Sequence, residues 1–169
     1  MITSHENFPK EGILFRDINP VFRDKDAIKL ISKSFLTKDD AENIRMMAGI
    51  ESRGFIVATA LALNHSKGVI MIRKAGKLPG KVIRESYEIE YGQAVMEIQE
   101  DAIKKNEKIF ILDDLIATGG TAIAAAGLIE KLGGIVSGFG FIIELSHLKG
   151  ADKLRNMGYH VKSLVKYND

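Results

Sequence analysis

Two apolar strands separated by an apolar helix form the first clear pattern in the chain. Residues 44–50 resemble a short buried strand, 55–64 a mostly apolar helix, and 68–73 a second strand rich in Val and Ile. Because a helix joins the two strands, the connection must cross over the sheet, so the strands should be parallel. Upstream, apolar residues at helical spacing predict a helix over 25–35 behind a possible Asp24 cap.

The second half of the chain continues this alternation. Four apolar residues at 109–112 predict a central strand, and a helix should follow from about 121 to 132. Two further strands are expected at 135–145 and 160–165. Strands alternating with helices predict an α/β fold, a mostly parallel twisted sheet flanked by helices, within a single domain over 1–169. Ligands in such sheets lie at the carboxyl ends of the strands.

Two segments depart from the alternation. Residues 8–20 are punctuated by Pro and Gly without a helical period, so they should run extended over the body of the protein. Residues 82–97 alternate polar and apolar positions around Gly92-Gln93. That pattern predicts a half-exposed hairpin that projects from the core.

Composition narrows the classes of function. The 24 basic and 22 acidic side chains give a net charge of +2, too balanced to predict a nucleic-acid or membrane surface. The absence of cysteine excludes disulfides, thiolate metal sites and a cysteine nucleophile. Neither a signal peptide nor an apolar run long enough to span a membrane is visible, so a cytoplasmic protein is expected. The four histidines have no zinc-binding spacing, so no protein-held metal is expected.

The segment after the 109–112 strand carries the strongest chemical signal. Thr118-Gly119-Gly120-Thr121 leads directly into the predicted helix. Glycines let backbone N–H groups approach a ligand closely, and the first turn of a helix offers free N–H donors and a positive dipole end. The two threonine hydroxyls can donate as well. The segment therefore predicts a site for a phosphate monoester.

Asp113 and Asp114 precede this loop and would repel a phosphate. Their expected task is to accept hydrogen bonds from vicinal hydroxyls, as on a ribose, which places a diol beside the phosphate. The alternative is a plain Gly-rich turn capped by Thr121, with both aspartates solvated at the strand end. The loop is neither a Walker A sequence nor a GxGxxG fingerprint, which disfavours a mononucleotide kinase or a dehydrogenase.

Residues 109–121 resemble the phosphoribosyl pyrophosphate (PRPP) motif of the type I phosphoribosyltransferases. Further segments, in order and approximate spacing, resemble the adenine-specific family within that group, from about Phe8 to Leu154. They comprise Phe8-Pro9, Phe15-Arg16-Asp17-Ile18, Gly49 to Phe55, Ile72-Arg73-Lys74, Gly76 to Gly80, Tyr87 to Gly92, Glu144-Leu145 and Leu148-Lys149-Gly150. Ala75 stands where some members carry a basic residue. The resemblance implies the type I fold with a flexible hairpin and a short N-terminal base-binding segment.

The resemblance also implies a reaction, in which adenine and PRPP give AMP and pyrophosphate in purine salvage. Asp113 and Asp114 would hold the ribose hydroxyls, and the loop Ala117, Thr118, Gly119, Gly120, Thr121 would cradle the 5′-phosphate. Ser52 and Arg53 would face the pyrophosphate, and the peptide before Ser52 is typically cis in this family. The basic side chains expected to assist them are Arg73, Lys74 and Lys77.

The same resemblance assigns the base and the hairpin. Phe15 would stack on adenine, Leu14 and Arg16 would contact its edge through main-chain groups, and Leu145 would pack on its other face. Glu90 and Tyr91 would close over the site from the hairpin. Glu90 is the candidate for proton transfer, and Arg53 and Tyr91 complete the implied catalytic set.

Departure of pyrophosphate from C1 of the ribose should develop oxocarbenium character, so the catalyst must stabilise the leaving anion. Mg²⁺ held mainly through the pyrophosphate oxygens is the implied cofactor, and a cytoplasmic homodimer without nucleic-acid or membrane partners is the implied assembly. Hydrolysis of PRPP is the side reaction that a closing hairpin would exclude.

Two other functions stay open at this point. One is a regulator with the same fold that senses PRPP and binds nucleic acid without catalysis, although none of the roughly 20 residues outside the matched region resembles a DNA-binding segment. The other is a transferase for a 6-oxopurine such as xanthine, which the short segment around Phe15 disfavours.

Overall fold

The computed structural model of the protein describes residues 1–89 and 92–169, and within these ranges its central feature is a seven-stranded sheet. The spatial order of the strands is β5-β6-β4-β3-β7-β8-β9. Their bounds are β3 Met46–Ile50, β4 Gly68–Lys74, β5 Val82–Ile89, β6 Gly92–Gln99, β7 Lys108–Ile116, β8 Ile135–Leu145 and β9 Val161–Tyr167. Five neighbouring strands, β4, β3, β7, β8 and β9, are parallel, which confirms the mostly parallel α/β sheet.

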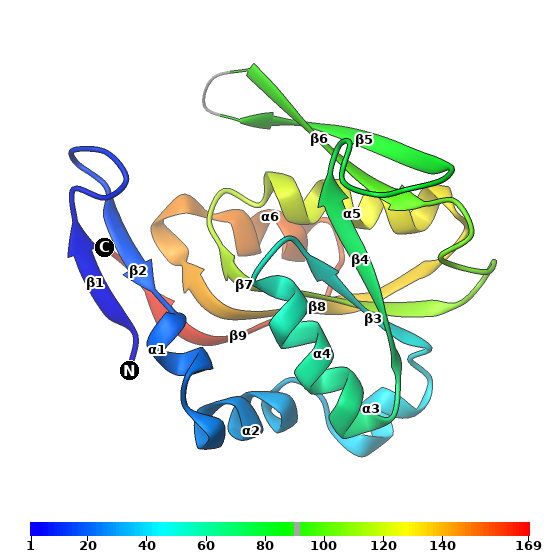
Figure 1. Cartoon of the computed structure of the whole chain (residues 1–169), viewed down its shortest axis with the longest axis horizontal. Coiled ribbons are helices and arrows are strands. Elements are labelled where there is room, and N and C mark those ends of the chain that lie inside the picture. Colours follow the sequence, from blue (N-terminus) through cyan, green and yellow to red (C-terminus); the bar gives the residue numbers. More distant parts are fainter. Residues whose placement is uncertain (90–91) are drawn as a thin grey trace.

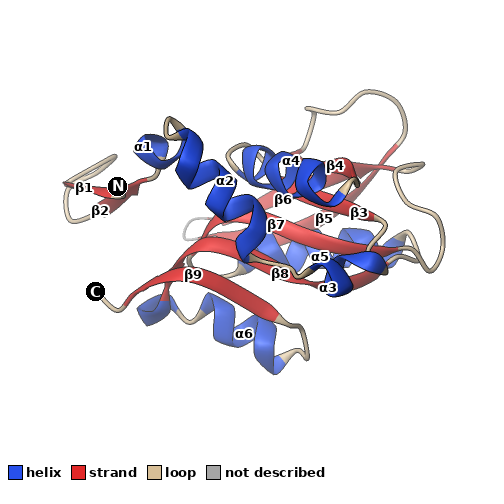
Figure 2. Ribbon diagram, turned by 90° about the horizontal axis from the view of Figure 1, so that it is seen from below, coloured by secondary structure: helices blue, strands red, loops and turns tan. Residues whose placement is uncertain are grey.

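Helices cover both faces of the sheet (Figure 1, Figure 2). The helices are α1 Asn19–Phe22, α2 Lys25–Ser34, α3 Lys38–Glu42, α4 Gly54–His65, α5 Gly120–Lys131 and α6 Gly150–Asn156, with a 3-10 turn, η1, at Ser146–Leu148. On one face α4 packs on β3 and β7, and α2 packs on α4. On the other face, the alanine-rich α5 packs on the sheet, and α6 lies against β9. No helix in the described ranges is both long and apolar enough to cross a membrane.

The expected helix over 25–35 is present as α2. Asp24 caps it, because its Oδ1 atom accepts the N–H groups of Asp26 and Ala27 at 2.9 Å. This satisfies two of the amides that the start of a helix leaves without a partner. The expected helix at 55–64 is present as α4, which is one residue longer at each end. The expected strand at 68–73 is present as β4, which is one residue longer at its carboxyl end.

The central strand is longer than the apolar run predicts. Expected to end at Leu112, β7 continues through the two aspartates to Ile116. Pairing with the long β8 extends it, with Asp113 opposite Phe141 and Ile116 opposite Glu144. The expectation that both aspartates follow the strand is therefore wrong, because the partner strand, and not the local apolar pattern, decides where β7 ends.

The N-terminal segment also differs from the expectation. Only part of residues 8–20 is extended, as β2 Leu14–Asp17, which pairs with β1 Thr3–Glu6 in a separate two-stranded sheet. The chain then turns into α1 from Asn19, where Asp17 Oδ1 accepts the N–H of Asn19 at 2.9 Å. This small sheet and the end of the chain lie close together in Figure 1.

The expected hairpin is formed by β5 and β6, which pair antiparallel from Val82–Gln99 to Ile89–Gly92. Figure 1 shows the end of β5 and the start of β6 projecting from the body of the molecule. Its base is part of the main sheet, because Arg73 and Lys74 of β4 pair with Glu97 and Met96 of β6. Gly92 and Gln93, expected at the turn, already belong to β6.

Candidate active site

The loop between β7 and α5 exposes a row of backbone donors. Gly119, at φ +87°, is the N-cap of α5, a left-handed conformation that glycine adopts without the penalty of a Cβ atom. Its carbonyl accepts the N–H of Ile123 at 2.9 Å, which starts the helix. Within the described residues, no backbone carbonyl accepts the N–H groups of Thr118, Gly119, Gly120 or Thr121. The start of a 12-residue helix thus offers free donors and a positive dipole end to an anion.

The two aspartates next to this loop have different surroundings. Asp114 is 6% exposed, and its Oδ2 atom accepts the Nε–H of Arg53 at 2.6 Å. Asp113 is half-buried, and its Oδ1 atom accepts the N–H of Asp114 at 2.8 Å. Burial first, and then the negative charge of Asp114, raise the pKa of Asp113 well above its ordinary value of 3.8. A second anion placed beside Asp113 would therefore be unfavourable.

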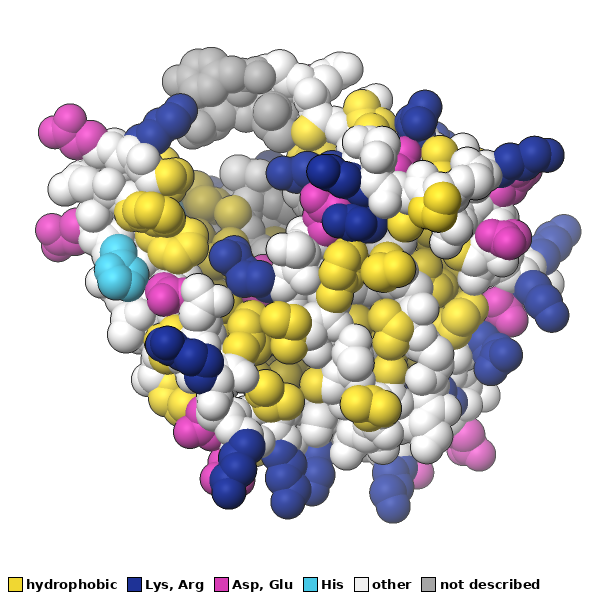
Figure 3. Space-filling model, in the orientation of Figure 1, with side chains coloured by type: hydrophobic (Ala, Val, Ile, Leu, Met, Phe, Trp, Pro, Cys, Tyr) yellow, Lys and Arg dark blue, Asp and Glu magenta, His cyan; other side chains and the backbone are white. Residues whose placement is uncertain are grey.

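These groups line a cavity of about 470 Å³ at the carboxyl ends of β3 and β7. In Figure 3 the surface is hollowed between the β1–β2 sheet and the β5–β6 hairpin. Of the residues proposed from the sequence, the lining contains Ser52, Arg53, Lys74, Asp113, Asp114, Ala117, Thr118, Gly119, Gly120 and Thr121. Segments far apart in the chain thus meet where an α/β sheet places its ligands.

The basic side chains of β4 and the following turn are only partly in this cavity. Lys74 lines it, whereas Arg73 and Lys77 do not. The Nε atom of Arg73 donates to Glu51 Oε2 at 3.1 Å, and the same oxygen accepts the N–H of Lys74 at 2.9 Å. The Lys77 N–H donates to Glu97 Oε1 at 2.9 Å. Two acidic side chains thus hold the basic turn beside the cavity.

Comparison with known proteins decides the family. The model of the phosphoribosyl transferase domain matches residues 23–163, most of the chain. The chain belongs to this family. It is 54% identical to an adenine phosphoribosyltransferase of Nitrosopumilus maritimus, over 98% of this chain and 96% of the relative. A relative with the same name from Cenarchaeum symbiosum is 48% identical over 99% of this chain and 97% of its own length.

Solved structures agree with this assignment. The adenine phosphoribosyltransferase of Saccharomyces cerevisiae, complexed with an imino-altritol bisphosphate and adenine, is 40% identical with a TM-score of 0.90, covering 97% of this chain and 94% of that one. The enzyme of Trypanosoma brucei, in complex with AMP, pyrophosphate and ribose-5-phosphate, is 26% identical with a TM-score of 0.86, covering 98% and 76%. The fold of this phosphoribosyltransferase is therefore the type I fold.

The residues proposed for the base do not line the cavity, although Phe15 lies next to one residue that does. Phe15 has neighbours from two segments. Its ring centroid is 5.1 Å from that of Phe8, and the Cζ atom of Arg53 is 5.9 Å from the Phe15 ring centroid. The side chain of Arg16 faces elsewhere, with its NH2 atom 2.7 Å from Asp169 Oδ2, so only its main chain is available to a ligand. Leu14 is exposed on β2, and Leu145 is half-buried at the end of β8.

The structure adds lining residues that sequence reasoning did not assign. Glu51, Met96, Leu115 and Ile116 line the cavity, and so does Tyr87 of β5. A Cβ atom added to Gly120 would lie 3.0 Å from Tyr87 Cδ2, so this ring packs on the start of α5. Glu51 directly precedes Ser52, and the peptide between them is cis, as the resemblance implies. Glu90 and Tyr91 lie outside the described residues.

The donor set of the cavity suits Mg²⁺ held through a substrate. Within the described ranges, no group of three or more His, Cys, Asp or Glu side chains could hold a metal by itself. The oxygen donors of the lining include the carboxylates of Asp113 and Asp114 and the hydroxyls of the loop. The Glu51 carboxylate also lines the cavity, but its Oε2 atom already accepts hydrogen bonds from Arg73 and Lys74. Mg²⁺ keeps several waters and binds through one or two carboxylates and substrate phosphates, which these residues can accommodate.

Proposed function

We propose that this chain catalyses the transfer of the 5-phosphoribosyl group of PRPP to adenine, giving AMP and pyrophosphate. One observation carries the proposal: the paired aspartates of β7 and the N–H donors at the start of α5 line the same cavity. The family and the names of close relatives over nearly the whole chain support the same reaction. The chain is then a pentosyltransferase that salvages a purine base.

The phosphate and the ribose take the two halves of the cavity. The 5′-phosphate lies on the loop formed by Ala117, Thr118, Gly119, Gly120 and Thr121, where backbone N–H groups and the two threonine hydroxyls donate to it. Beside it, Asp113 and Asp114 accept hydrogen bonds from the ribose hydroxyls. Since burial keeps the pKa of Asp113 high, a diol, which donates hydrogen bonds without adding negative charge, fits this pair better than a second phosphate.

The leaving pyrophosphate lies on the cationic side of the cavity. As the bond from C1 to the pyrophosphate oxygen breaks, negative charge grows on the leaving group, and a ring nitrogen of adenine bonds to C1. Arg53 and Lys74 lie in the cavity wall, with Ser52 beside them, and Arg73 and Lys77 add positive charge just outside it. Fixed charges directed at the leaving group stabilise the transition state more than the substrate. Mg²⁺ held mainly through the substrate, with the carboxylates of Asp113 and Asp114 nearby, would neutralise further charge on the leaving group.

Adenine lies between the N-terminal segment and the end of β8. Phe15 stacks on one face, Leu145 packs on the other, and the main chain of Leu14 and Arg16 contacts the edge of the base. The position of Phe15 next to Arg53 supports this, because it brings the base-binding segment to the pyrophosphate side of the cavity. Glu90 and Tyr91 complete the site from the hairpin, where Glu90 exchanges a proton with the base.

A homodimer in the cytoplasm completes the proposal. Helix α4 is apolar on nearly all sides, yet Ile56 is 43% exposed and Leu63 78% exposed, and on β4 Val69 and Met71 are 39% and 47% exposed. Figure 3 shows hydrophobic side chains gathered over these two elements. An apolar helix normally has all its sides covered, and a clustered apolar patch marks a protein interface. A second copy of the chain is the proposed cover.

Incubation of the protein with PRPP, Mg²⁺ and one purine base at a time tests the proposal. Formation of AMP and pyrophosphate with adenine alone is the expected result. Turnover with xanthine or another 6-oxopurine, and not with adenine, would transfer the assignment to that base. Binding of PRPP measured by calorimetry, with no product from any base, would instead favour a PRPP-sensing regulator.

A further inference from the structure

Helix α6 lies directly behind the proposed phosphate loop and holds two of its carbonyl oxygens. The N–H of Gly150, the first residue of α6, donates to the oxygen of Ala117 at 3.0 Å. One turn further along α6, the Nζ atom of Lys153 donates to the oxygen of Thr118 at 3.2 Å. Two consecutive peptide groups of the loop are therefore fixed from the same side.

This contact determines where the loop directs its donors. A peptide group is planar and almost always trans, so its C=O and N–H bonds point in opposite directions. The carbonyls of Ala117 and Thr118 point toward α6, which turns the N–H groups of Thr118 and Gly119 away from α6. Both residues line the cavity, and no described backbone carbonyl accepts either N–H group.

The approach of Gly150 to the loop leaves no space for a side chain. A Cβ atom at this position would lie 2.2 Å from the Ala117 oxygen and 2.6 Å from the Gly119 nitrogen. Both atoms belong to the backbone, so they can yield only if the loop itself moves. Any side chain at Gly150 would therefore displace the peptide groups that carry the N–H donors.

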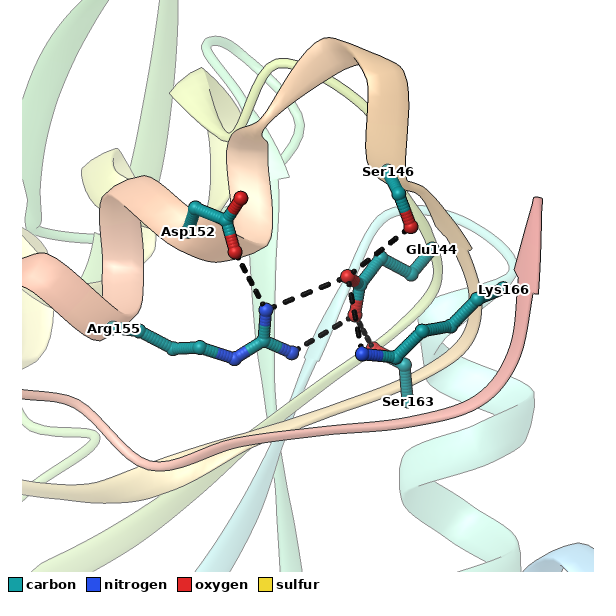
Figure 4. A network of polar contacts seen from close by, with 6 residues as sticks. All are labelled: Glu144, Ser146, Asp152, Arg155, Ser163 and Lys166. Atoms are coloured by element: carbon teal, nitrogen blue, oxygen red, sulfur yellow. Dashed lines mark hydrogen bonds and ion pairs between the residues drawn. The ribbon is translucent and has the colours of Figure 1, made fainter. Parts of the chain in front are cut away.

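Helix α6 is itself anchored to the sheet by a buried carboxylate. In Figure 4 the guanidinium of Arg155 on α6 faces both Glu144 and Asp152. Its NH2 atom lies 2.9 Å from Oε2 of Glu144, and its NH1 atom lies 2.9 Å from Oδ1 of Asp152. Glu144 is 3% exposed on β8, and its Oε2 atom also accepts the hydroxyl of Ser163 on β9 at 2.7 Å. Burial alone would raise the pKa of Glu144, but the bonds and charges of its partners lower it, so the anchor stays ionised.

We propose that α6 positions the phosphate loop for substrate binding: Gly150 and Lys153 orient its peptide groups toward the 5′-phosphate, and the Arg155–Glu144 pair holds α6 in place. This inference rests on the proposed function and extends it to residues that do not touch the substrate. Gly150 and Lys153 are positioning residues. Their loss should weaken the binding of phosphate-bearing ligands and leave the binding of adenine unchanged.

Steady-state kinetics of Lys153→Met and Gly150→Ala test the proposal. Lys153 is exposed, so its replacement should leave the fold intact. We expect KM for PRPP to rise about fivefold in Lys153→Met and about tenfold or more in Gly150→Ala, with kcat and KM for adenine within about twofold. Lys153→Arg, which keeps a donor at this position, should restore most of the affinity. Lys67→Met is the matched control, because Lys67 also donates to one main-chain oxygen, that of Glu42, far from the loop.

Three results would overturn the proposal. The first is a KM for PRPP in Lys153→Met equal to that of Lys67→Met. The second is an equal loss of affinity for adenine and for PRPP in the α6 variants. The third is a Gly150→Ala enzyme with unchanged PRPP affinity. If Gly150→Ala fails to fold, Lys153→Met and Lys153→Arg decide. Calorimetry with ribose 5-phosphate separates this inference from the proposed reaction. A wild-type protein that forms no AMP would refute the reaction, whereas the ribose 5-phosphate affinities of the variants still test the role of α6.

Discussion

Arg53, at the start of α4, and Asp114, in β7, form a partly buried ion pair in the candidate site, with Arg53 Nε 2.6 Å from Asp114 Oδ2. The Arg53 side chain keeps 40% of its surface exposed, whereas that of Asp114 keeps 9%. One end of the guanidinium is therefore fixed by the carboxylate that we propose for the ribose, and the exposed remainder can face the proposed pyrophosphate. The pair links the two proposed subsites through a single side chain.

Asp114→Asn should weaken PRPP binding and leave adenine binding unchanged. The amide keeps the shape of the side chain but loses the negative charge that holds Arg53 and that, in our proposal, strengthens the hydrogen bonds from the ribose hydroxyls. A charged hydrogen bond contributes about 1.5–3 kcal/mol, so the dissociation constant of PRPP should rise about tenfold or more in calorimetry. Asp101→Asn, at an exposed aspartate of a distant turn, is the control. Unchanged PRPP affinity in Asp114→Asn would refute the ribose assignment.

Phe15→Ala should weaken the binding of adenine and leave the binding of PRPP nearly unchanged. Loss of the ring removes the proposed stacking face and its edge-to-face contact with Phe8, so KM for adenine should rise about tenfold. KM for PRPP should change less than about twofold, because Phe15 does not line the cavity that contains the phosphate loop and the two aspartates. Phe15→Tyr keeps an aromatic face and should stay near wild type. Equal effects on both substrates would place Phe15 in the fold and not in the base site.

Glu97 provides a prediction of pH dependence. This 1% exposed side chain accepts the N–H groups of Lys77 and Leu78 and the Nε–H of Arg84. Burial alone would raise its pKa, but these bonds lower it below the ordinary value of 4.5. Since folding lowers the pKa, the contribution to stability is complete above about pH 4.5 and is lost as the pH falls through the lower folded value.

Glu97→Gln should therefore lower the free energy of unfolding by about 1–3 kcal/mol at pH 7, measured by urea denaturation. The difference from wild type should shrink as the pH falls below 4.5 and through the lowered pKa of Glu97, because the wild-type carboxylate then becomes protonated. Glu100→Gln, at a neighbouring exposed glutamate, should show neither effect. A difference between Glu97→Gln and wild type that stays constant with pH would contradict an ionised Glu97 as the support of the basic turn.

Leu63→Glu should dissociate the proposed homodimer. A charge introduced on the exposed apolar side of α4 would lose its hydration in an interface, which costs free energy. On a free surface the charge stays hydrated and has no such cost. Sedimentation equilibrium should show a dimer for the wild type and a monomer for the variant. Met157→Glu, at a residue that is 53% exposed near the end of α6, should remain dimeric. A wild-type monomer, or a dimeric Leu63→Glu, would remove this patch from the interface.

The order of elements follows from local patterns in the sequence. The buried run at 109–112, the cap at Asp24 and the helix before Gly133-Gly134 are each determined by residues next to one another. Patterns of this kind predicted the parallel sheet, the hairpin and the glycine-containing loop. The resemblance contributed the residues of the pyrophosphate and base sites, whose roles remain predictions.

Features that depend on distant pairing were not predictable in the same way. The end of β7 is set by β8, the polar strand β1 exists because it pairs with β2, and α6 is held by Glu144 from another strand. The pairing of Arg53 with Asp114 joins residues that are 61 positions apart in the chain. No local periodicity encodes such contacts, so they appear only in the folded chain.

The place where an anion binds is the central claim, and a crystal of the protein with AMP tests it most directly. We predict that the 5′-phosphate lies on the N–H groups of residues 118–121 at the start of α5, with the ribose hydroxyls on Asp113 and Asp114. A 5′-phosphate found anywhere else on the protein, with that loop unoccupied, would contradict the account.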